Sequence, residues 1–156
     1  MIATTESFIA HVVAHAGSST DQADLAIRAV LAAIGGELDR AQLDLVADEL
    51  PPALAAALCE GGGAARPVED ELCAWGVRLG AARELVASVC HALAEGLSNE
   101  ALAAIRAVAS PTIVSFLAAD EVELAPPVGR GSTLATGRHG SHHPLSEGTS
   151  VRLPRG

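Results

Sequence analysis

The chain has 156 residues, about a fifth of which are alanine, and this length fits one domain of ordinary size. Residues 1–124 hold eighteen acidic residues and six arginines, a balance of −12, whereas residues 125–156 hold one glutamate and four arginines, a balance of +3. The acidic body argues against binding to nucleic-acid phosphates, and no apolar run approaches the roughly 18 residues of a membrane span, so we expect neither partner.

Three cysteines, an odd number without close spacing, argue against a disulfide scaffold: Cys59, Cys73 and Cys90. The N-terminal segment lacks a basic leader before its apolar stretch, unlike a secretory signal. We therefore expect a cytoplasmic protein with reduced thiols.

The first predicted helix covers residues 8–16, where apolar positions recur at helical spacing, and Gly17 provides its stop. A second helix follows, with Thr20 or Asp21 as its N-terminal cap and Gly35-Gly36 as its end. No stretch of the chain shows a sustained period-two alternation of β-branched residues, so strands are not expected.

Local signals also predict where the third, fourth and fifth helices begin. Asp39 and Gln42 have the spacing of a capping box, which predicts the start of a third helix. Proline suits the first position of a helix, so Pro52 opens a fourth one. The acidic residues 69–71 open a fifth helix, since negative charge opposes the positive end of its dipole.

The pattern then repeats, because residues 29–58 align without a gap with residues 88–117 at a constant offset of 59. The identical pairs are Val30/Val89, Ala33/Ala92, Leu38/Leu97, Leu43/Leu102, Pro52/Pro111 and Leu58/Leu117. We predict an all-α fold in which a four-short-helix unit is duplicated, giving about eight helices in one globular domain over residues 1–120. The copies lie at about 5–59 and 68–119, with a linker at 60–67, and residues 121–156 form a disordered basic tail.

One skeleton of apolar, glycine and proline positions resembles the bacterial domain of unknown function 2267 family, over about residues 5–119. Its residues here are Phe8, Val12, Gly17, Ala29-Val30-Leu31, Leu38, Leu50-Pro51-Pro52 and Leu54. The second copy departs from it, with Ala109-Ser110-Pro111 in place of the Leu-Pro-Pro segment. The resemblance implies the helical fold and supplies no catalytic residue and no cofactor, and we expect none. The tail is also similar to C-terminal extensions of some members.

Two groups in the helical body contain residue types that bind metals. His11 and His15 are four apart on one helix, but two ligands make no closed site, so we expect two half-exposed histidines. Cys73, Cys90 and His91 would form a thiolate-rich site only if the fifth and sixth helices meet. Cys90 takes the position of a core leucine of the first copy, where cysteine behaves as a small hydrophobe.

An acidic patch of Asp44, Asp48 and Glu49 follows Arg40 by one turn. Charges at this spacing are ordinary on a solvated helix face. Nothing in the sequence suggests an environment that would separate the pKa values of two carboxylates, so that one acts as an acid and the other as a base. No glycine-rich phosphate loop and no nucleophile elbow is present, and we predict no catalytic residues.

We predict a non-enzymatic interaction module, in which the acidic helical body carries a linear tail that docks on a protein partner. The docking residues are Leu134, Gly137, Arg138, His139, His142, His143, Pro144 and Leu145. The three tail histidines are weak metal candidates, since ordering a disordered segment reduces affinity. One alternative is a small-ligand or metal-binding protein, or a weak enzyme, that uses the groove between the copies near Trp75 and Cys90. Another is a homodimer that forms through exposed alanine-rich faces.

Overall fold

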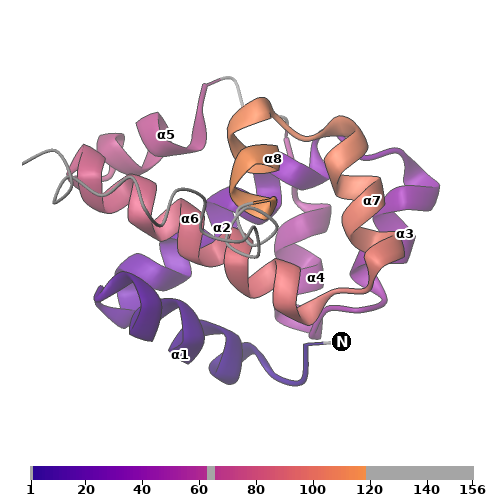
Figure 1. The fold of residues 1–156 in the computed structure, drawn as a ribbon, viewed down its shortest axis with the longest axis horizontal. Helices are drawn as coiled ribbons and strands as arrows, with labels where there is room; N and C mark the ends of the chain where they lie inside the picture. The colour runs from indigo at the N-terminus through magenta and orange to yellow at the C-terminus, as the bar shows by residue number, and fades with distance from the viewer. Residues whose placement is uncertain (1, 63–65, 119–156) are drawn as a thin grey trace, which may run out of the picture. The chain divides into compact units, whose positions relative to one another are not determined.

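The computed structural model describes residues 2–62 and 66–118, which form eight α-helices and no strand, and the predicted all-α class is confirmed. The helices are α1 (Thr5–Ala16), α2 (Thr20–Gly35), α3 (Arg40–Ala47), α4 (Pro52–Cys59), α5 (Val68–Ala74), α6 (Leu79–Gly96), α7 (Asn99–Val108) and α8 (Pro111–Leu117) (Figure 1). None of these described helices is long and apolar enough to cross a membrane. The predicted disordered tail, 121–156, lies outside the described residues.

Short-range signals set the helix starts. Asp39 and Gln42 form both hydrogen bonds of the predicted capping box at the start of α3. Pro52 is the first residue of α4, as predicted, and Ser110 caps α8 ahead of Pro111, the first residue of that helix. The cap of α2 differs from the prediction: the Ser19 hydroxyl accepts a hydrogen bond from the Gln22 N–H, so the helix begins one residue earlier.

The spacing of the helices fits the predicted duplication. Helices α6, α7 and α8 begin 59 residues after α2, α3 and α4. Gly17 and Gly76, the two described residues with positive φ, at 61° and 93°, are also 59 residues apart. Only glycine adopts this conformation without strain, so each copy changes direction at the same point after its first helix.

The helices of the first half (α1–α4) make extensive contacts with those of the second half (α5–α8). Helices α2 and α6 contact each other, α4 packs on α2, and α8 packs on α6 in the equivalent way. Helix α1 contacts both α2 and α6, and α5 contacts both α6 and α2, so the first helix of each half crosses to the other half. Figure 1 shows α1 running along α6, which is the contact that builds the candidate site.

Equivalent positions are buried in both halves. These pairs include Ala23/Ala82, Ile27/Val86, Val30/Val89, Leu31/Cys90, Ile34/Leu93, Val46/Ile105 and Leu58/Leu117. Each large aliphatic member contributes about 1.5–3 kcal/mol through its burial. Cys90 occupies a core position, as predicted: burial raises the pKa of its thiol to about 12, and the charge of Glu69 adds to the effect.

Two further contacts hold the helices in place. A Cβ atom at Gly35 would lie 1.8 Å from the carbonyl oxygen of Leu58, so glycine alone lets α2 approach the end of α4 this closely. Glu49, which follows α3, reaches the start of α7 in the other half. Its carboxylate accepts hydrogen bonds from the Ser98 N–H at 2.7 Å and from the Ser98 hydroxyl at 2.5 Å.

Candidate metal centre

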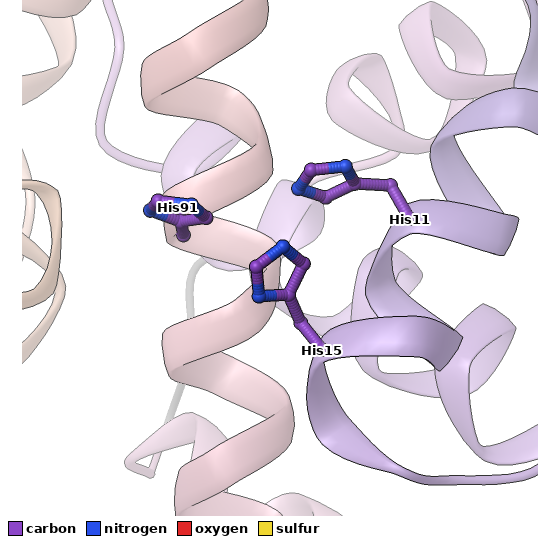
Figure 2. A group of neighbouring side chains, drawn as sticks. All are labelled: His11, His15 and His91. Carbon is purple, nitrogen blue, oxygen red and sulfur yellow. The ribbon is translucent and has the colours of Figure 1, made fainter.

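The contact between α1 and α6 brings three histidines together. His11 and His15 lie one turn apart on the same face of α1, and that face packs on α6. His91 lies on α6 opposite them. Figure 2 shows the His11 and His15 rings reaching from α1 toward the His91 ring. The site therefore combines side chains from both halves of the chain.

The three rings are close enough to share one ion. One nitrogen from each ring lies within 4.8 Å of the other two, and this is the one such group among the described His, Cys, Asp and Glu residues. The ring centroids are 4.4 Å apart for His11–His15, 5.0 Å for His15–His91 and 5.9 Å for His11–His91. A tetrahedral zinc ion with Zn–N bonds of about 2.0–2.1 Å holds its ligands roughly 3.3–3.4 Å apart. Modest side-chain rotations therefore suffice to bring the nitrogens into ligand positions.

A carboxylate lies against this cluster. Glu95 follows His91 by one turn of α6, and its Oε2 atom is 3.1 Å from His11 Nε2. Its Oε1 atom is 3.6 Å from His91 Nε2. The orientation of the first contact does not make a hydrogen bond, so the His11 Nε2 atom is closed off from solvent without a hydrogen-bond partner among the described residues. Such a buried polar atom costs about 1–3 kcal/mol, and a metal ion would satisfy it.

The packing of α1 on α6 does not itself require histidine. The equivalent contact in the other half, α5 on α2, has Asp70, Ala74 and Ala32 at the positions that correspond to His11, His15 and His91 at the offset of 59. Small and acidic side chains therefore satisfy the same helix contact. Histidines therefore stand at this helix contact in one half of the chain and not at the corresponding positions of the other, which favours a chemical role for them.

The structure regroups the histidines and cysteines that the sequence singled out. Cys73, Cys90 and His91 do not form a metal-ligating cluster within the described residues. Cys90 points into the core, and its neighbour His91 instead faces α1, because adjacent residues of a helix point about 100° apart. The thiolate-rich grouping, which the sequence offered only as a conditional alternative, therefore does not form among the described residues, and His91 instead groups with His11 and His15.

The side chains of the acidic patch make separate contacts in the structure. Asp44 pairs with Arg40 at 3.3 Å, an i, i+4 contact on an exposed helix face, as predicted. Glu49 instead accepts hydrogen bonds from Ser98, the N-terminal cap of α7. The two hydrogen bonds that Ser98 donates, chiefly the one from its hydroxyl and then the one from its backbone N–H, lower the pKa of Glu49.

The groove near Trp75 differs from the prediction. Trp75 is 67% exposed and lines a pocket of ≈ 280 Å³ that α2, α4 and α5 form. Cys90 does not line this pocket, because its side chain is fully buried. The contact between the halves that does gather chemical groups lies instead between α1 and α6.

The predicted docking residues lie outside the described residues. They are Leu134, Gly137, Arg138, His139, His142, His143, Pro144 and Leu145.

Comparison with known proteins identifies the family of the chain. No curated protein and no solved structure matches it. A family model described as "Uncharacterized conserved protein (DUF2267)" matches residues 5–113, a range that includes α1–α7 and all three clustered histidines. That range covers both halves of the helical body and agrees with the resemblance seen in the sequence. The chain belongs to the DUF2267 family.

Proposed function

We propose that the protein binds one divalent transition-metal ion through His11, His15 and His91. The observation that carries this proposal is the convergence of three imidazole nitrogens within 4.8 Å from two helices. Neutral imidazole is a common ligand of zinc, copper and nickel, and an i, i+4 histidine pair on one helix face suits a single ion.

Two further features support metal binding. The buried Nε2 atom of His11, which makes no hydrogen bond among the described residues, would gain a bond to the ion. The balance of −12 over residues 1–124 attracts cations to the helical body. Because the ligands come from α1 and α6, the ion joins the two halves of the fold.

Calorimetric titration with zinc near neutral pH tests the proposal, because imidazole binds zinc as the neutral ring. The parent protein is a tail-histidine variant (His139→Ala/His142→Ala/His143→Ala), which removes the competing imidazoles of the tail. We expect one zinc ion per chain. In the same background, His15→Ala/His91→Ala should weaken binding by about 100-fold or more, beyond the loss typical of an outer-shell residue.

We expect the fold to tolerate both substitutions. Alanine already stands at the equivalent positions of the other half, Ala74 and Ala32, so the helix contact tolerates it. Unchanged zinc affinity in His15→Ala/His91→Ala, with helical content retained in circular dichroism, would refute the proposal.

A second candidate function is a cytoplasmic interaction module whose C-terminal tail docks on a protein partner. The charge contrast supports it, because residues 1–124 carry a balance of −12 and residues 125–156 a balance of +3. A linear recognition segment gains specificity by ordering when it binds. Affinity capture with the full chain and with a variant that ends at residue 124 tests the docking role, and an identical set of captured proteins would contradict it.

A further inference from the structure

Two pairs of metal-ligating side chains face each other across the contact between α1 and α6. Helix α1 carries His11 and His15, and α6 carries His91 and Glu95. Residues four apart lie on one face of a helix, so each pair projects toward the same side. The 3.1 Å contact between Glu95 Oε2 and His11 Nε2 shows that the face of α6 with these two residues is the one turned to α1.

The Glu95 carboxylate lies close to two of the three histidines, although it is not one of the group whose ligand atoms all lie within 4.8 Å of one another. One oxygen is 3.1 Å from His11 Nε2 and the other is 3.6 Å from His91 Nε2. Its side chain is 54% exposed, so it can move toward an ion without disturbing the core. Carboxylate oxygens bind zinc at about 2.0–2.2 Å, a distance that a rotation of this flexible side chain supplies.

We propose that Glu95 is the fourth ligand of the ion that His11, His15 and His91 bind, and this inference rests on the metal binding proposed above. Three imidazole nitrogens and one carboxylate oxygen form a four-coordinate set with a single negative charge, which fits zinc. When protein side chains fill all four coordination positions of the ion, no position is left for a substrate or a reactive water. The ion then fastens α1 to α6, and it does not activate water for hydrolysis.

A different role for Glu95 makes a different prediction. A carboxylate that accepts a hydrogen bond from a ligating histidine only orients the ring, and the fourth position of the ion then holds water. Small anions such as azide replace a bound water, whereas they do not enter a closed four-coordinate site. Whether azide binds to the ion therefore distinguishes a Glu95 that is a ligand from a Glu95 that only orients a histidine ring.

Cobalt(II) is the probe, because its visible absorption reports the coordination of the ion directly. The tail-histidine variant serves as the parent, and Glu95→Ala is compared with Glu37→Ala, which removes one exposed carboxylate from the turn after α2. We expect azide to leave the cobalt spectra of the parent and of Glu37→Ala unchanged. Glu95→Ala should bind cobalt about 10–100-fold more weakly, and azide should change its spectrum.

The outcomes distinguish this inference from the proposal on which it rests. An azide-sensitive spectrum in the parent, or an azide-insensitive one in Glu95→Ala, overturns the role of Glu95 and leaves the three-histidine site standing. Failure of the parent to take up cobalt, or uptake that His15→Ala/His91→Ala does not weaken, overturns metal binding at this site altogether.

Discussion

Glu49 ties the end of α3 to the start of α7, and Glu49→Ala should weaken the contact between the two halves. The substitution removes the acceptor of two hydrogen bonds from Ser98, at 2.7 Å and 2.5 Å. Hydrogen bonds to charged groups contribute about 1.5–3 kcal/mol in general, and less where water screens the charge. Because Glu49 is partly exposed, we expect the free energy of unfolding to fall by about 1 kcal/mol.

Urea denaturation followed by circular dichroism measures this loss, with Asp48→Ala as the matched control at an exposed neighbour. The hydrogen bonds lower the pKa of Glu49 below its ordinary value of 4.5. Its contribution is therefore fully present above pH 4.5 and is lost as the pH falls through the lowered pKa of the folded state. An equal loss in Asp48→Ala, or a difference between wild type and Glu49→Ala that persists at the lowest pH, would refute this reasoning.

Two further predictions concern the close approach at Gly35 and the reactivity of the cysteines. Gly35→Ala should lower the free energy of unfolding by about 2 kcal/mol or more, because the new Cβ meets the Leu58 carbonyl oxygen, whereas Ala94→Gly at the equivalent position should cost only about 1 kcal/mol. Equal midpoints of thermal unfolding for the two variants would contradict this. Near pH 8, a thiol reagent should modify the exposed Cys59 quickly and Cys90 only on unfolding, since burial raises the pKa of Cys90 to about 12. Rapid labelling of Cys90 in the folded protein, located by mass spectrometry, would show that this part of the core opens.

The helices were predictable because their signals are local. A capping box at Asp39 and a proline at Pro52 act within one turn, so the residues themselves mark the start of α3 and α4. The start of α2 was displaced by one residue, since Ser19, Thr20 and Asp21 all have side chains that cap a helix. Which of these neighbouring residues caps the helix depends on the backbone geometry at the turn, and the sequence pattern does not specify that geometry.

The candidate metal centre was not predictable in the same way. The spacing of His11 and His15 shows that they share a helix face, but which helix covers that face depends on long-range packing. Helix α1 crosses to α6 of the other half, and this contact adds His91. A usable signal was present in the equal spacing of His91 and Glu95, which pairs two ligating side chains on one face of α6. The cysteine next to His91 belongs to a different face of α6, because Cys90 lies in the core and His91 faces α1.

Anomalous diffraction from zinc-soaked crystals of the tail-histidine variant tests the central claim most directly, because it locates the ion itself. We predict one anomalous peak per chain between α1 and α6, about 2.0–2.1 Å from a nitrogen of His11, His15 and His91. A peak at another site, or none between these helices at saturating zinc, would contradict the claim that the three histidines form a metal centre.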